Sequence, residues 1–296
     1  MKRRLAIGCG ILVLLGVTGA LFLKVKFSPP AEVVPLGVAG QSVVLPQVTV
    51  INPGRDRAAG RTVVLSGDRI VSVGGAPEVG EVLANYRGHY VLPGLIDMHS
   101  HLPPSTPLRL TEYISLLNLA YGITTLREPG DLSGTAVDAA REGMAKGEFP
   151  GPRIFSCGPF ITGGERRWVN SIVVSTPEEA RQAVGEVAAA GHQCVKSYED
   201  LTVEQIRALV AEARERGLPV LSHVPYQLGY DEALLPGVEH LLGIPPPSTL
   251  DRDHMVNRLA QWGAVDDARL DRIVEVTLEH GIENTPTLVL HHRLLR

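Results

Sequence analysis

The feature that most constrains this fold is an alternation of short apolar runs with amphipathic helical stretches over residues 93–296. Thr176 and Thr202 each start one of these helices, because a Glu or Gln follows three residues later. Gly191 and Gly217 are typical helix ends. Strands that alternate with helices indicate a parallel sheet, and this many units without a nucleotide-type glycine loop favour a (β/α) barrel of the TIM type.

Seven apolar runs are expected to form the barrel strands, whereas a closed barrel of this type has about eight. They lie at residues 95–98, 123–126, 153–157, 193–197, 219–223, 238–242 and 281–288. Because Arg296 follows soon after the seventh run, we expect a barrel that lacks its last strand.

Residues 41–92 precede the expected barrel and contain short β-type runs broken by turns, such as Val43–Ile51 and Arg69–Val73. We expect them to form a small β-sheet domain. Residues 27–40 are rich in proline and small side chains, which is typical of a linker. The barrel is expected to occupy residues 93–296.

The N-terminal segment has the charge pattern of a membrane-targeting sequence. Lys2, Arg3 and Arg4 precede the run Leu5–Leu23, which has no charged residue and would be about 28 Å long as a helix. Positive charge before such a run favours a cytoplasmic N-terminus and export of the rest. We therefore expect residues 1–26 to be a signal anchor with one transmembrane helix, and the following domains to be periplasmic or extracellular.

Two other interpretations of this segment stay open. Thr18-Gly19-Ala20 has small residues where a signal peptidase could cleave, although apolar residues continue to Leu23. A lipoprotein signal ending at Cys9 fits less well, because the apolar stretch follows this cysteine. All three interpretations direct the chain to a membrane.

Charge and cysteine usage exclude several other classes of protein. The net charge of −4, without a basic stripe interleaved with aromatic residues, gives no reason to expect nucleic acid as a partner. Hydrophobic residues make up 44% of the chain, which excludes disorder. Cys9, Cys157 and Cys194 lack the paired spacing of a zinc ribbon or a disulfide framework, and Cys194 is expected to be a small buried side chain.

The strongest local motif is His99-Ser100-His101, at the end of the first expected barrel strand. Side chains two apart in a strand point to one face, so both imidazoles are expected to face the barrel interior. Barrel enzymes place their sites at the carboxyl ends of strands, and paired imidazoles suit a divalent metal. Taken alone the motif is weak, because such pairs also occur on surfaces.

Lys196, His223 and His240 strengthen this motif, since each lies at the end of a different expected strand. A single strand-end histidine is more often a hydrogen-bonded core residue than a ligand, and a strand-end lysine usually reaches solvent. Five such residues at one barrel rim are much less expected by chance. Tyr198 and the loop 163–168 are weaker candidates: Tyr198 faces either the pocket or the core, and the loop either grips substrate or is a solvated charged segment.

The phrases VLPGLIDMHSH, GITTLREPG, VKSY, LSHV and GVEHLLG resemble the successive strand signatures of the amidohydrolase superfamily, particularly its imidazolonepropionase-like and prolidase-like members. The resemblance runs from about Val48 to Leu290. It implies that residues 41–92 are the N-terminal part of a composite β-sandwich. As a set, these motifs are specific for the superfamily and do not name a substrate.

The resemblance also implies a metal centre and a mechanism. His99 and His101 would hold the more buried ion, His223 and His240 the second, and Lys196 would bridge both as a carboxylated lysine. One or two zinc ions are the expected cofactor, although the same ligands accept other divalent metals. A metal-bound hydroxide would attack a small-molecule substrate, and Lys196 and His240 are the residues expected to act in catalysis.

The chain departs from the family pattern in one respect. Family members carry an aspartate at the end of the eighth strand, and no residue here matches it; Asp97 shares the face of His99 but has a structural role in the family. We therefore expect a C-terminally truncated barrel, in which proton transfer by that aspartate, typically worth about 10²- to 10⁴-fold, is missing.

The leading hypothesis is a hydrolase of carbon–nitrogen bonds other than ordinary peptides, such as cyclic amides or N-acyl compounds. An Xaa-Pro-type dipeptidase, a mononuclear deaminase with unmodified Lys196, and an inactive membrane-tethered remnant are the alternatives. The sequence predicts no oligomeric state.

Overall fold

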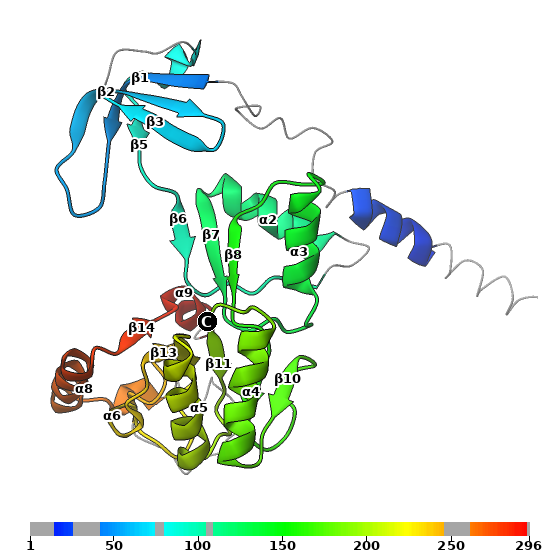
Figure 1. Ribbon diagram of the computed structural model, residues 1–296, viewed down its shortest axis with the longest axis vertical. Coiled ribbons are helices and arrows are strands. Elements are labelled where there is room, and N and C mark those ends of the chain that lie inside the picture. The colour runs from blue at the N-terminus through cyan, green and yellow to red at the C-terminus, as the bar shows by residue number, and fades with distance from the viewer. Residues whose placement is uncertain (1–14, 26–41, 75–79, 105–108, 246–260, 295–296) are drawn as a thin grey trace, which may run out of the picture. The chain divides into compact units, whose positions relative to one another are not determined.

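A computed structural model describes residues 15–25, 42–74, 80–104, 109–245 and 261–294. The chain divides into two compact units (Figure 1). One spans Pro30–Leu95, and the other comprises Ile96–Arg296 together with Met1–Pro29.

The unit Pro30–Leu95 contains one five-stranded sheet in its described residues, where the sequence predicted part of a β-sandwich. Its order is β3-β2-β1-β4, and β5 also pairs with β1. Gly67 has a φ of 57° in the tight turn between β2 and β3, a conformation that glycine adopts without a steric penalty. The strands are β1 (Ser42–Val50), β2 (Ala58–Ser66), β3 (Arg69–Val73), β4 (Glu81–Val82) and β5 (Tyr90–Val91), with a 3₁₀ turn at Ala84–Tyr86.

The larger unit is an α/β structure with parallel strands, as predicted. A three-stranded sheet has the order β6-β7-β8, and a six-stranded sheet has the order β10-β9-β11-β12-β13-β14. The β7–β8 pair and all neighbouring pairs of the six-stranded sheet are parallel. The strands are β6 (Leu95–Asp97), β7 (Ile123–Glu128), β8 (Arg153–Ser156), β9 (Phe160–Thr162), β10 (Ser171–Val173), β11 (Val195–Ser197), β12 (Val220–Ser222), β13 (Gly237–Glu239) and β14 (Glu283–Thr285).

The third predicted strand corresponds to β8, and a break at residues 157–159 separates it from β9 and thereby separates the two sheets. Gly158 has a φ of 71° and Pro159 has no N–H to donate, so a continuous ladder cannot pass through residues 157–159. As a result β8 pairs with β7, whereas β9 pairs with β11 and β10. The strands β9 and β10 were not separately predicted.

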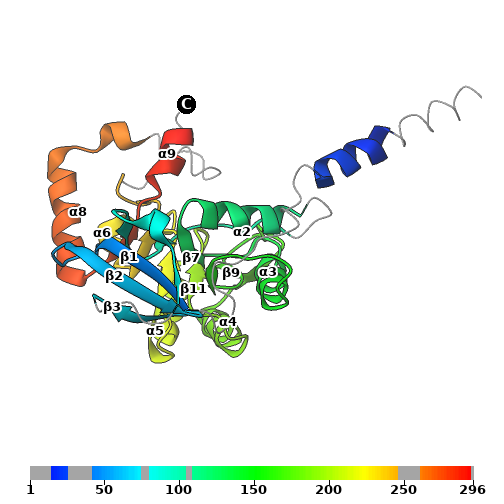
Figure 2. The same cartoon turned by 90° about the horizontal axis from the view of Figure 1, so that it is seen from above.

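The helices start where the capping residues predicted. The Thr176 side chain accepts a hydrogen bond from the Glu179 amide, and Thr202 with Gln205 forms a capping box. Helices α3, α4 and α5 lie outside strands β7, β9 and β11 (Figure 2). The helices are α2 (Leu110–Ala120), α3 (Ala136–Ala145), α4 (Pro177–Ala189), α5 (Val203–Glu215), α6 (Tyr230–Ala233), α8 (Asp267–His280) and α9 (Leu288–Leu294), with a 3₁₀ turn at Gln261–Ala264.

The main hydrophobic core lies between the six-stranded sheet and its helices. The apolar stripe of α4 packs against α5, and both helices share one buried cluster with residues of β11, β12 and β13. Val195, Val220 and Val238 are the strand contributors, and all are at most 3% exposed. Because strand side chains alternate between faces, their neighbours, including Lys196, point to the other side of the sheet.

The prediction that Cys194 is buried is confirmed, but the inference that the cysteines do not pair was wrong, because Cys157 and Cys194 form a disulfide. The two residues are 37 apart in sequence, but β8 ends directly before Cys157 and β11 begins directly after Cys194. Neighbouring strand ends bring their Cα atoms to 4.3 Å. Only this tertiary contact pairs them, which is why the spacing along the sequence gave no sign of it.

The predicted transmembrane span is not supported. In the described part of the chain, no helix combines the length and the apolar character needed to cross a bilayer. A helix covers residues 15–25. The start of the predicted span, residues 5–14, and the predicted linker, residues 27–40, lie outside the described residues.

Candidate active site

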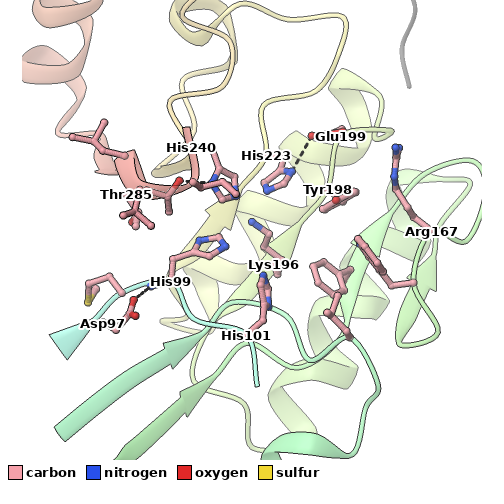
Figure 3. A pocket seen from close by; sticks show the side chains of 18 residues that line it. Asp97, His99, His101, Arg167, Lys196, Tyr198, Glu199, His223, His240 and Thr285 are labelled. Carbon is pink, nitrogen blue, oxygen red and sulfur yellow. Dashed lines mark hydrogen bonds and ion pairs between the residues drawn. The ribbon is translucent and has the colours of Figure 1, made fainter. Parts of the chain in front are cut away.

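A cavity of ≈ 810 Å³ opens at the carboxyl ends of the strands in the larger unit. Its volume lies within the range of small-molecule sites. All five residues selected from the sequence line it (Figure 3). They are His99, His101, Lys196, His223 and His240.

Three of these side chains directly follow a strand or lie within one, whereas the other two do not lie at a strand end as predicted. His223 directly follows β12, His240 directly follows β13, and Lys196 is the middle residue of β11. His99 and His101 lie beyond the end of β6, which stops at Asp97. They reach the same cavity because a side-chain hydrogen bond holds this loop: Asp97 Oδ1 accepts from the His99 amide at 2.9 Å.

The four imidazoles form a connected row along the cavity. The ring centroids of His101 and His99 are 5.2 Å apart, those of His99 and His240 are 4.4 Å apart, and those of His240 and His223 are 4.9 Å apart. Four imidazoles at this spacing, with an amine between them, form a nitrogen-rich donor set that suits divalent metals of the first transition row.

Each imidazole has its Nδ1 atom held by a polar side chain, which makes Nε2 the ring nitrogen that would coordinate a metal ion. Metal-binding histidines have this arrangement, because the second-shell partner fixes the tautomer and the ring orientation. The Nδ1 partners are Glu239 for His99 (2.5 Å), Glu128 for His101 (2.7 Å), Glu199 for His223 (2.9 Å) and Thr287 for His240 (2.6 Å).

These partners were missed in the sequence, although a signal was present. Glu128 ends the apolar strand β7, and Glu239 ends β13 immediately before a predicted ligand. Both carboxylates are at most 1% exposed. A buried carboxylate needs hydrogen-bond or charged partners, so an acidic residue at the end of an apolar strand indicates a second-shell role.

Lys196 is the most unusual member of the site. Its side chain is 1% exposed, and its Nζ atom has no hydrogen-bond partner among the described residues. Burial lowers the pKa of this amine to about 8. A buried amine without a partner is costly for a protein that does not use it, which indicates a ligand or a modification at this nitrogen.

Burial also keeps the imidazoles of His99 and His240 neutral. Desolvation lowers the pKa of His99 to about 4, and desolvation together with the nearby His223, His99 and Lys196 lowers the pKa of His240. Neutral imidazole is the form that binds a metal ion. The site therefore needs no proton loss from these two rings near neutral pH.

Strained backbone conformations occur at the edge of the cavity, around His240 and Thr287. His240, Leu241 and Thr287 have φ values of 61°, 55° and 48°, in the left-handed region that non-glycine residues rarely adopt. The Thr287 hydroxyl is the partner of His240, so both ends of that hydrogen bond are on strained residues. Such strain persists where the surrounding structure imposes it, and it is concentrated at functional sites.

The cavity wall beyond the histidines combines aromatic and cationic character. Phe160, Trp168 and Tyr198 line it, with Phe160 ring centroids 6.1 Å from Trp168 and 5.4 Å from Tyr198. Arg167 lines the same wall (Figure 3), and its guanidinium donates to the Tyr226 hydroxyl at 3.5 Å. The loop 163–168, whose role the sequence left open, thus contributes residues to the cavity.

The residues present fit a divalent metal through their donor chemistry. As the side chains stand, no three His, Cys, Asp or Glu residues of the described segments have the spacing of a closed metal site. The fit rests on the four Nε2 atoms and the orphaned Lys196 Nζ, because a lysine is not among those residue types until it is carboxylated. The assignment of these residues as ligands stays a prediction.

Comparisons with known proteins agree with this architecture. The profile of the amidohydrolase family matches residues 90–292. An adenine deaminase from Thermosipho africanus (strain TCF52B) is 32% identical over 97 residues, which span 32% of this chain and 17% of the deaminase. A solved Xaa-Pro dipeptidase with bound methionine has a TM-score of 0.56 at 19% identity. The match covers 84% of this chain and 67% of the dipeptidase chain. The solved bottromycin amidohydrolase has a TM-score of 0.60 at 21% identity. The match covers 91% of this chain and 58% of the bottromycin amidohydrolase chain. The chain is therefore a member of the amidohydrolase family.

Proposed function

We propose that this protein hydrolyses carbon–nitrogen bonds in small molecules, such as N-acyl compounds or cyclic amides, with a divalent metal held by the five cavity residues. Members of its family are typically dependent on such a metal. The observation that carries the proposal is Lys196: a buried amine without a partner, surrounded by imidazoles whose Nδ1 atoms are already bonded.

In this proposal Lys196 reacts with carbon dioxide. The lone pair of the neutral Nζ forms an N–C bond to the carbon, one C=O π pair moves onto oxygen, and Nζ releases one proton to solvent. The product is a carbamate with two anionic oxygen ligands in place of the orphaned nitrogen. The lowered pKa of Lys196 favours the neutral amine that this step requires.

His99 and His101 would hold one ion, His223 and His240 the second, and the Lys196 carbamate would bridge them. Zinc is the ion that imidazole and carbamate ligands suit best here, with manganese, iron and cobalt as alternatives. A bound ion of this kind lowers the pKa of a water molecule to about 7 and polarises the scissile carbonyl. The chain's own residues orient these ligands through Glu128, Glu199, Glu239 and Thr287.

Removal of the metal is expected to abolish turnover and to lower the melting temperature. With zinc at about 100 times its dissociation constant, binding adds about 2.7 kcal/mol of stability, which is roughly 5–11 °C for a domain of this size. Dialysis against a chelator, followed by zinc with bicarbonate, should remove and then restore hydrolysis of N-acyl or cyclic amide substrates. Metal analysis should find close to two ions per chain. One ion with ammonia as product would favour the deaminase alternative, and no tightly bound ion would contradict the proposal.

The cavity wall predicts which substrates react fastest. Arg167 presents a guanidinium in a pocket with an aromatic wall, so a substrate with a carboxylate and an apolar group fits it. We expect an N-acyl amino acid to react faster than its neutral C-terminal amide, and Arg167→Met to lower kcat/KM for the acid alone, by about 10- to 100-fold. Arg166→Met is the matched control, because Arg166 donates to the Val169 carbonyl and does not line the cavity. Equal losses on acid and amide would contradict this role of Arg167.

We also propose that the catalytic unit is exported across a membrane. Supporting this are the positive residues before the apolar N-terminal run and the disulfide between Cys157 and Cys194. Disulfides persist in oxidising compartments and are rare in the cytosol. Fractionation of cells that express the tagged full chain, with protease added from outside, tests the location.

A further inference from the structure

Arg127, on β7, lies near the cavity and makes three hydrogen bonds there, although the proposed hydrolysis assigns it no role. Its Nε donates to the Met98 carbonyl at 2.8 Å, and one terminal nitrogen donates to Glu239 Oε1 and Thr285 Oγ1, each at 2.9 Å. The side chain is 13% exposed. These contacts reach the loop after β6, the end of β13 and the end of β14.

The contacts of Arg127 cross between two sheets that share no backbone pairing in the described residues. β7 belongs to the three-stranded sheet, whereas β13 and β14 belong to the six-stranded sheet. The side chain therefore joins the segment that carries His99 to the strand end that carries His240. A rigid, planar guanidinium can hold several acceptors in fixed geometry at once, which a lysine amine does less well.

Glu239 transmits this contact to a ligand. One carboxylate oxygen accepts from Arg127 and the other from His99 Nδ1, and the side chain is 1% exposed. Without the guanidinium, the buried carboxylate loses a charged hydrogen-bond donor that holds it in one rotamer. The His99 ring then loses the acceptor that fixes its orientation.

We infer that Arg127 is a positioning residue of the metal centre: it fixes Glu239, which in turn orients His99, and it holds the two sheets together at the cavity. This inference rests on the proposed metal-dependent function. Second-shell partners of this kind typically change metal affinity by about 10- to 100-fold, so Arg127→Met is expected to weaken zinc binding by that factor. Arg127→Lys keeps the positive charge but lacks the planar guanidinium. Its zinc affinity should fall between that of Arg127→Met and that of the wild type.

The test measures the zinc dissociation constant by competition with a chromophoric chelator, in the full chain, alongside the melting temperature of the metal-free protein. Arg141→Met is the matched control. Arg141 is also half-buried and also joins two segments, through the Ile154 carbonyl and the Gln193 side chain, but it does not line the cavity. It should lower the melting temperature and leave zinc affinity unchanged.

The double variant Arg127→Met/Glu239→Gln separates positioning from general damage. If Arg127 acts through Glu239, the double variant binds zinc about as weakly as Glu239→Gln alone. Wild-type zinc affinity in Arg127→Met, or an equal loss in Arg141→Met, overturns the inference. Should Arg127→Met fail to fold, the zinc affinity of Arg127→Lys is compared in the same way, alone and combined with Glu239→Gln. Absence of zinc binding in the wild type would contradict the proposed function instead.

Discussion

Replacing Lys196 with alanine is expected to lower kcat/KM by at least about 10³-fold, because it removes the group proposed to bridge two metal ions, and metal stabilisation of the transition state is worth several kcal/mol. The Lys196 side chain is buried among the four imidazoles, so a side chain on the protein surface cannot move in to replace it as a ligand. Turnover of an N-acyl substrate and metal content measured on the same sample give the result.

The cavity left by Lys196→Ala allows a specific rescue. A small carboxylate such as acetate or propionate has the two oxygens of a carbamate, so adding it with zinc should restore part of the activity. Lys146→Ala is the matched control, since Lys146 is an exposed residue directly after α3 that pairs with Glu142. Full activity of Lys196→Ala with both ions bound would contradict the bridging role. Equal rescue by chloride and by carboxylates would contradict the claim that the added carboxylate replaces the carbamate oxygens.

Loss of the Cys157–Cys194 disulfide is expected to lower the melting temperature by about 6–16 °C. Closing a loop between residues 37 apart is worth roughly 3–4 kcal/mol in the chain-entropy account, and each kcal/mol corresponds to about 2–4 °C in a domain of this size. The effect should reach the site as well, because Cys194 is two residues before Lys196 and packs with Leu221, the residue paired with Lys196 in the sheet.

Calorimetry of the double variant Cys157→Ala/Cys194→Ala, compared with the wild type with and without reductant, measures this effect. Cys9→Ala is the matched control, because Cys9 is not part of the pair. Reductant should shift the wild type and the control equally and should not shift the double variant. A double variant that melts within 2 °C of the wild type, or two thiols that react in the unreduced native protein, would contradict the prediction.

The sequence by itself determined the class of fold and the ligand candidates. Helix caps such as Thr176 and Thr202 act within four residues, and the apolar runs of β11, β12 and β13 have a periodicity that is visible locally. The strand ends of a barrel gather at one face, so the positions of Lys196, His223 and His240 along the chain already indicated one cavity.

Only the tertiary structure decided what surrounds those candidate ligands. Glu128, Glu199 and Glu239 become hydrogen-bond partners of the histidines because each lies opposite a histidine from a different part of the chain: His99 and Glu239 are 140 residues apart. The disulfide and the Arg127 contacts depend in the same way on which strand ends become neighbours, and the break at residues 157–159 decides those neighbours. Local patterns determine elements within a few residues, whereas hydrogen-bond partners over a hundred residues away are set by packing.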